Sequence, residues 1–125
     1  MALAGTGDMR EILSRIAVGD EAAELAFDVY IHRLRALIGA MAAAMNGLDA
    51  LVFTGGVGEN AAPVRASAAA GLKFLGVGID PELNAEAGDD RDISAKGATV
   101  PTLVIKAKES IEVAREVRRV LATPA

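Results

Sequence analysis

Residues 51–60 read Leu-Val-Phe-Thr-Gly-Gly-Val-Gly-Glu-Asn, an apolar run that leads straight into a cluster of glycines. A short apolar run bounded by glycine, here Ala50 to Thr54, is typical of a strand buried on both faces of a parallel sheet. Glycines let the backbone approach a ligand closely, and a following helix offers free N–H groups and its positive dipole end to a phosphate. The stretch therefore predicts a strand, a glycine turn and a helix that bind a nucleotide. The alternative is a tight turn without a ligand.

Two helices are expected before this stretch. Apolar spacing predicts the first over residues 8–18, where Asp8 and Glu11 have the spacing of a capping box. The second is predicted from Asp20, as N-cap, to about Met45, with Asn46 and Gly47 ending it. Its C-terminal half is apolar nearly all round, so we expect burial on more than one side. Its apolar stripe comprises Ala23, Phe27, Tyr30, Leu34, Leu37, Ile38, Met41 and Met45.

The segments after the glycines complete an α/β pattern. Asn60 can cap a third helix whose buried face carries Val64, Ala68 and Leu72. A second core strand is expected within 99–106, and Leu75 to Ile79 is a candidate third strand. Residues 84–99 read as a solvated loop with room for a small ribbon. A last helix follows from Glu109, and the residues expected to face inward are Ile111, Ala114, Val117, Val120 and Leu121.

Length and composition narrow the function classes. The 125 residues suit one domain over 1–125, and 13 Lys and Arg against 17 Asp and Glu give a net charge of −4. We therefore expect no nucleic-acid partner and no membrane partner, since both favour basic patches. With no cysteine and no export signal, a cytoplasmic location is expected. Two or three strands are few for an independent sheet, which suggests a part of something larger.

A dinucleotide-binding module is the first alternative function. Gly56-x-Gly58-x-x-Ala61 fits the relaxed fingerprint of a Rossmann-type NAD-binding fold, and Asp80 follows at a distance suited to a ribose ligand. The position of the motif argues against this, because two helices precede the strand that carries it.

Several segments, in order and spacing, resemble the C-terminal part of the acetate and propionate kinase family. The resemblance extends over residues 7–121, and the Phe-Thr-Gly-Gly-Val-Gly-Glu-Asn run is its most specific part. The matching segments are Gly7-Asp8-Met9-Arg10-Glu11, Asp28-Val29-Tyr30 with His32-Arg33, Ile38-Gly39-Ala40, residues 48–60, Val64-Arg65, Leu75-Gly76-Val77 and Ile93-Ser94.

The resemblance implies an α/β fold: the C-terminal, nucleotide-holding half of an actin-like, ribonuclease-H-like kinase domain, with a short parallel-type sheet and flanking helices. It implies ATP or ADP as substrate with Mg²⁺, a short-chain carboxylate as acceptor in the complete enzyme, and a homodimer. Glu109 takes the place of the family's magnesium-associated glutamate. The positions that match the family's nucleotide-binding segments are Asp8, Met9, Arg10, Gly56, Val57, Gly58, Glu59 and Asn60.

The sequence departs from the family at two places. Lys106-Ala107-Lys108 stands where the family commonly has Pro-Thr-Asn or Pro-Thr-Asp, which puts Lys108 beside Glu109. The family's cationic cluster for the transferred phosphoryl group lies upstream of residue 7 of this chain, so we expect negligible kinase activity from the chain alone. The third hypothesis is a non-catalytic remnant that dimerises through its apolar helices.

Overall fold

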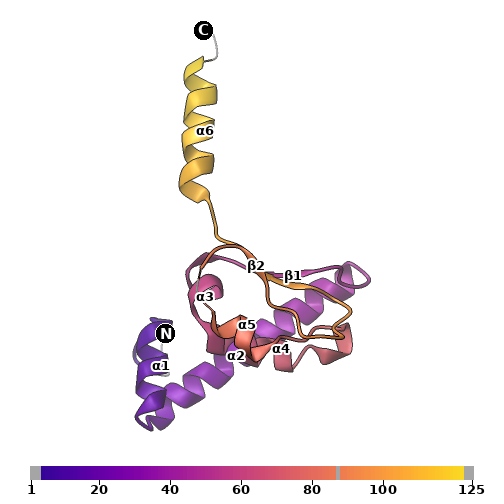
Figure 1. Cartoon of the computed structure of the whole chain (residues 1–125). Coiled ribbons are helices and arrows are strands. Elements are labelled where there is room, and N and C mark those ends of the chain that lie inside the picture. Colours follow the sequence, from indigo (N-terminus) through magenta and orange to yellow (C-terminus); the bar gives the residue numbers. More distant parts are fainter. Residues whose placement is uncertain (1–3, 87, 123–125) are drawn as a thin grey trace.

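Helices joined to a small sheet make up the chain in this computed structural model, which describes residues 4–86 and 88–122 (Figure 1). The elements in chain order are α1 (Met9–Ala17), α2 (Glu21–Ala44), β1 (Leu51–Phe53), α3 (Gly55–Asn60), α4 (Ala62–Ala70), the 3₁₀ helix η1 (Lys73–Leu75), α5 (Pro81–Ala85), β2 (Arg91–Asp92), β3 (Thr102–Val104) and α6 (Glu109–Ala122).

The sheet has the strand order β1-β3-β2. Strand β1 runs parallel to β3, with Leu51 opposite Thr102 and Phe53 opposite Val104, whereas β2 runs antiparallel to β3. The prediction of an α/β fold with a short sheet and flanking helices is confirmed. The third strand comes from the loop region in which a ribbon was expected.

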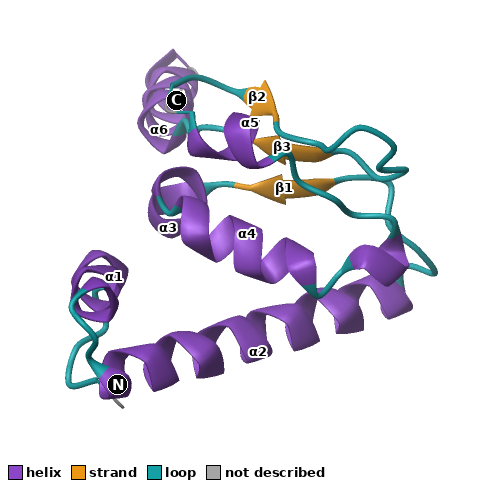
Figure 2. Cartoon of the chain, turned by 60° about the horizontal axis from the view of Figure 1, so that its bottom comes forward, coloured by secondary structure: helices purple, strands orange, loops and turns teal. Residues whose placement is uncertain are grey.

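The expectation that β1 is buried on both faces is wrong. Leu51 and Phe53 are buried, but Val52 between them is 47% exposed. Figure 2 shows the reason: α4 lies on one side of the sheet with α2 beyond it, so side chains that alternate along β1 meet helices on one face only. As an end strand in the order, β1 pairs with β3 alone.

Two apolar clusters hold the elements together. The first joins α2, β1 and α4 through Ile38, Phe53, Ala68 and Leu72, among others. The second joins α1, α2 and α4 through buried residues that include Met9, Ile12, Ala23, Ile31 and Val64. The predicted buried face of residues 64–72 is therefore confirmed.

Local capping signals at the two N-terminal helices are confirmed. The Asp8 carboxylate accepts a hydrogen bond from the Arg10 N–H at 2.9 Å, and Asp20 accepts from the amides that follow it. The capping box is incomplete, since Glu11 accepts from the Thr6 hydroxyl at 3.1 Å instead of reaching back to Asp8. The end of α2 has Asn46 at φ 60° and Gly47 at φ 134°, as their residue types predict.

The apolar face of α2 is only partly covered, which corrects the expectation for its C-terminal half. Ala23 and Ile38 of the predicted stripe are buried, together with Ile31 and Ala42, which the stripe did not include. Four other members of the stripe remain exposed, because α1 and α4 pack on one side of the helix. Those four are Tyr30, Leu37, Met41 and the C-cap residue Met45, here called the open face of α2; Leu25 is also exposed but lies on a different side of the helix.

The glycine run is itself helical, so the prediction that Asn60 caps the next helix is wrong. Thr54 is extended and Gly55 has φ +79°, which turns the chain directly from β1 into α3. The Asn60 amide group donates back to the carbonyl of Gly56 at 2.9 Å within this helix. Helix α4 then begins after Ala61 without a side-chain cap.

Residues 75–79 do not form the candidate third strand. They follow η1 and make only two isolated bridges, between Val77 and Val100 and between Ile79 and Ser94. Gly76 has φ +90°, far from the extended conformation of a strand, and a Cβ there would collide with the Thr99 hydroxyl oxygen, so the chain turns at a position that only glycine fits.

Helix α6 stands away from the rest of the chain (Figure 1), and its apolar side does not face inward. Ile111, Val117 and Leu121 are all exposed, which overturns the expected packing. Two pairs stabilise its surface, since Arg115 donates to Glu112 at 2.8 Å and Arg119 donates to Glu116. Within residues 4–86 and 88–122, no helix has the length and apolar character needed to cross a membrane.

Candidate functional site

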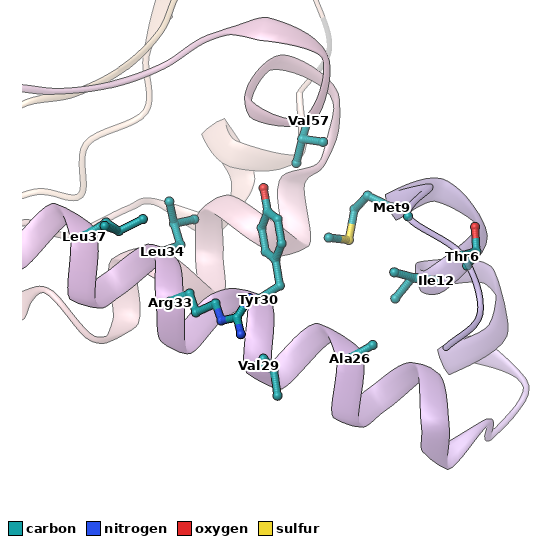
Figure 3. Close-up of a pocket in the computed structure, with 11 residues that line it drawn as sticks. Thr6, Met9, Ile12, Ala26, Val29, Tyr30, Arg33, Leu34, Leu37 and Val57 are labelled. Carbon is teal, nitrogen blue, oxygen red and sulfur yellow. The ribbon is translucent and has the colours of Figure 1, made fainter. Parts of the chain in front are cut away.

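An open, mainly apolar pocket lies between α1, α2 and α3 (Figure 3). Its volume is about 770 Å³, which is within the range of small-molecule sites. Polar atoms at its rim come from Thr6 and Arg33. The apolar part of its wall is formed by Met9, Ile12, Ala26, Val29, Tyr30, Leu34, Leu37 and Val57.

The pocket brings together one residue from each of the two predicted nucleotide-binding segments. Met9 is the first residue of α1, and Val57 lies in the middle of α3. Figure 3 shows Tyr30 of α2 rising beside them, with its hydroxyl directed toward Val57 and the Met9 side chain reaching toward its ring. Because these side chains come from three elements, the pocket exists only in the folded chain. Its apolar walls suit a flat, weakly polar group such as a heteroaromatic ring.

Asp8 and Arg10 flank Met9 but do not line the pocket. Asp8 is the N-cap of α1, and the Arg10 side chain, 92% exposed, approaches it at 3.4 Å. The side-chain hydrogen bond from Arg10 is the main cause that lowers the pKa of Asp8. Both side chains therefore stand at the outer end of α1, where an exposed pair adds little stability.

Gly56 and Gly58 have different surroundings within α3. A Cβ on Gly58 would lie 3.3 Å from the carbonyl carbon of Phe53, which is a tight contact with backbone, whereas a Cβ on Gly56 would meet nothing within 4 Å. Gly58 is thus required by the close approach of α3 to the end of β1. No packing requirement of this kind explains the glycine at position 56.

Glu59 and Asn60, the last two residues of the predicted segment, form hydrogen bonds away from the pocket. Glu59 Oε2 accepts a hydrogen bond from the Ala107 N–H at 3.1 Å. The Asn60 side chain bonds within α3, as described above. Neither residue lines the pocket.

Glu109, the predicted magnesium-associated residue, begins α6, but its side chain is outside what the structure describes. Its neighbourhood is rich in paired charges: Lys108 lies 3.9 Å from Asp90, and Lys106 lies 3.9 Å from Asp89. Among the described residues no group of three or more His, Asp or Glu side chains could hold a metal ion. The Glu109 side chain is not among the residues searched, so its part in holding Mg²⁺ stays a prediction.

Arg65 was not predicted from the sequence as a site residue, but it binds the C-terminal end of α3. This arginine is only 2% exposed, and its Nη1 donates to the carbonyls of Gly58 and Glu59 at 2.9 and 3.0 Å. Its Nε and Nη2 donate to the side chain and backbone oxygens of the buried Asn84. Burial is the main cause that lowers the pKa of the Arg65 guanidinium. Two signals were available in the sequence: its place next to Val64 on the buried side of α4, and the Val64-Arg65 segment that resembles the acetate and propionate kinase family.

Asp80, the proposed ribose ligand of a dinucleotide module, is engaged elsewhere. Its carboxylate caps α5 by accepting from the amides of Glu82 and Leu83 at 2.8 and 3.2 Å. These bonds stabilise the start of α5, so capping by itself explains why an aspartate stands at this position. The dinucleotide alternative is accordingly not favoured.

Comparison with known proteins agrees with this arrangement. The chain is 53% identical over 111 residues to an acetate kinase of Gloeobacter violaceus, which covers 89% of this chain and 27% of that protein. It resembles the crystal structure of Porphyromonas gingivalis acetate kinase with a TM-score of 0.82 and 37% identity, over 91% of this chain and 29% of the other. A propionate kinase from Francisella tularensis gives the same TM-score and coverage. Because residues 1–115 also match the profile of the acetokinase family, this chain belongs to that family.

Proposed function

We propose that this chain forms the adenine-nucleotide-binding part of an acetate kinase-type phosphotransferase. The observation that carries the proposal is the meeting of Met9 and Val57 in one apolar pocket, because each comes from a segment that resembles a family nucleotide-binding motif. An adenine ring would lie against these two side chains and Tyr30. The backbone of Gly56 to Asn60 and the exposed Asp8 and Arg10 side chains at the start of α1 would then face the remainder of the nucleotide.

The reaction itself would need more than this chain supplies. Phosphoryl transfer depends on cations around the γ-phosphoryl group and on an oriented acceptor. The chain spans 27% of the length of the Gloeobacter relative, and we place the acceptor site for a short-chain carboxylate in the remaining length. Mg²⁺ would enter with the nucleotide phosphates, because proteins commonly bind it through substrate phosphates and one or two carboxylates while it keeps several waters. Alone, the chain is expected to bind nucleotide without turnover.

The open face of α2 supports a dimer as part of the same proposal. Large apolar side chains such as Leu37, Met41 and Met45 are exposed along one helix, and contiguous apolar surface of this kind marks interaction sites. A cytoplasmic location is also proposed, on the absence of cysteine from the sequence.

Equilibrium titration with Mg-ATP, ADP and NAD, followed by calorimetry, tests the nucleotide proposal. Val57→Asp puts a charge into the apolar wall and should weaken ADP binding by at least about tenfold, since a buried unpaired carboxylate is strongly disfavoured. Val18→Asp is the matched control, because Val18 is 84% exposed and lies outside the pocket. An assay for acetyl phosphate accompanies the titration.

Each result has a definite reading. Adenine-nucleotide binding that is lost in Val57→Asp and kept in Val18→Asp supports the proposal. Tighter binding of NAD than of ADP would return the dinucleotide alternative, and binding of none of the three would leave the non-catalytic remnant. Turnover by the unaided chain would refute the claim that the remaining length of the relatives is needed.

A further inference from the structure

We propose that Arg65 is a positioning residue for the nucleotide-binding segment: it holds the C-terminal end of α3 so that Val57 keeps its place in the pocket wall. This inference rests on the proposed function and deepens it, because it identifies what fixes the glycine-rich segment. Arg65 touches no part of the pocket itself.

The first step of the argument concerns the short helix α3. It has six residues, Gly55–Asn60, and three of them are glycines, which lose more backbone entropy on ordering than other residues. The last carbonyls of a helix have no partner within it. Arg65 supplies donors to two of them, Gly58 and Glu59, with a single nitrogen, Nη1. A segment with weak intrinsic preference for helix is thus held by a group from the next helix.

The second step concerns the guanidinium group, which is itself fixed. Nε donates to Asn84 Oδ1 at 2.7 Å, and Nη2 donates to the Asn84 carbonyl at 2.8 Å. Asn84 is 5% exposed, and its own Nδ2 donates to the carbonyl of Ala62 at 3.0 Å. From its place in α4, Arg65 therefore joins α3 to α5 through one planar group, a geometry that a lysine ammonium cannot reproduce, and Asn84 adds the bond to the start of α4.

The third step concerns charge. Within the described chain no carboxylate forms an ion pair with Arg65, although the group is almost fully buried. A buried cation costs stability unless its hydrogen bonds are satisfied, and here backbone carbonyls and one amide satisfy them. A core position that only needed volume would be filled more favourably by an apolar residue. The arrangement is explained if the hydrogen bonds to α3 are what the position requires.

The test compares Arg65→Met and Arg65→Lys with a matched control, Arg35→Met. Arg35 is half-buried and, like Arg65, donates to a backbone carbonyl, that of Ser67, but from α2. Amide hydrogen exchange is measured in α3 and, as an internal reference, in α1, and ADP affinity is measured by calorimetry at a temperature where every variant is folded. Asn84→Ala is the milder variant to use if Arg65→Met does not fold.

We expect Arg65→Met to raise exchange in α3 relative to α1 and to weaken ADP binding by roughly tenfold, the effect of losing hydrogen bonds to a charged donor. Arg65→Lys should recover only part of both effects, and Arg35→Met should change neither ratio. Equal exchange changes in α3 and α1, or a loosened α3 with unchanged affinity, would overturn the proposal. Full recovery by lysine would do so as well, since charge alone would then suffice.

Failure of the proposed function gives a different pattern. If the unsubstituted chain binds no ADP, the nucleotide role of Arg65 falls together with that function. The exchange ratio between α3 and α1 still decides, in that case, whether Arg65 holds α3.

Discussion

Glu59 Oε2 accepts a hydrogen bond from the backbone N–H of Ala107 at 3.1 Å, although the two residues lie 48 positions apart in the sequence. The bond ties α3 to the segment between β3 and α6. The two preceding amides of this segment are held as well, Ile105 by the Phe53 carbonyl at 3.0 Å and Lys106 by Asp90 at 2.7 Å. Three consecutive amides just before α6 are thus bound to β1, to the loop that holds Asp90 and to α3.

Removal of the Glu59 carboxylate should make the segment between β3 and α6 more mobile. Glu59→Ala is expected to accelerate amide exchange at Ala107 severalfold, while the free energy of unfolding changes by less than about 1 kcal/mol because the bond is exposed to solvent. Glu59→Gln keeps an acceptor oxygen and serves as the control. Exchange at Ala107 that is the same in all three proteins would contradict the expectation.

Glycine substitutions in α3 should separate packing from ligand contact. Gly58→Ala is expected to lower the unfolding midpoint, because its Cβ would press on the Phe53 backbone at 3.3 Å. Gly56→Ala should be neutral or stabilising by up to about 1 kcal/mol, since alanine is the better helix former and the site is open. Thermal unfolding of both variants checks the order. If Gly56→Ala is the less stable of the two, the placement of α3 against β1 is wrong.

The free energy of unfolding at acid pH should depend on the ionisation of Asp20, the N-cap of α2. A side-chain hydrogen bond from Arg15, at 2.7 Å, is the main cause that lowers the pKa of Asp20 below its ordinary value of 3.8. The folded state therefore binds the proton less readily than the unfolded state. The resulting stabilisation is present above pH 3.8 and is lost as the pH falls through the lower pKa of the folded protein.

Asp20→Asn keeps a capping side chain but removes this titration. Urea unfolding across the acid range should show a weaker loss of stability below about pH 4 than in the unsubstituted protein. In an Arg15→Met background the same substitution should alter the pH dependence less. An equal effect in both backgrounds would show that Arg15 does not act through Asp20.

Truncation of two neighbouring apolar residues on α2 should lower stability by very different amounts. Ile38→Ala empties a buried position and is expected to cost about 2–4 kcal/mol, whereas Met41→Ala, on the open face of α2, should change stability by less than about 0.5 kcal/mol. Met41→Glu should instead weaken any self-association that sedimentation detects, because it places a charge on exposed apolar surface. A large loss of stability in Met41→Ala would mean that this face is covered.

The sequence by itself determined the features that depend on near neighbours in the chain. The caps at Asp8 and Asp20 and the left-handed residues Asn46 and Gly47 follow from backbone conformation and hydrogen bonds a few residues long. The apolar run predicts a strand at residues 51–53, but its hydrogen-bond partner β3 lies at residues 102–104. Met9 and Val57 could also be singled out before the fold was known, because the segments that contain them are specific.

Only the tertiary structure decided which apolar faces are covered and which distant residues meet. In sequence, the apolar stripes of α2 and α6 resemble those of any buried helix. Their burial depends on which elements pack against them, and the periodicity of a sequence does not contain that information. For the same reason the sequence did not predict what Arg65 does: its contacts with Gly58, Glu59 and Asn84 form only in the folded chain.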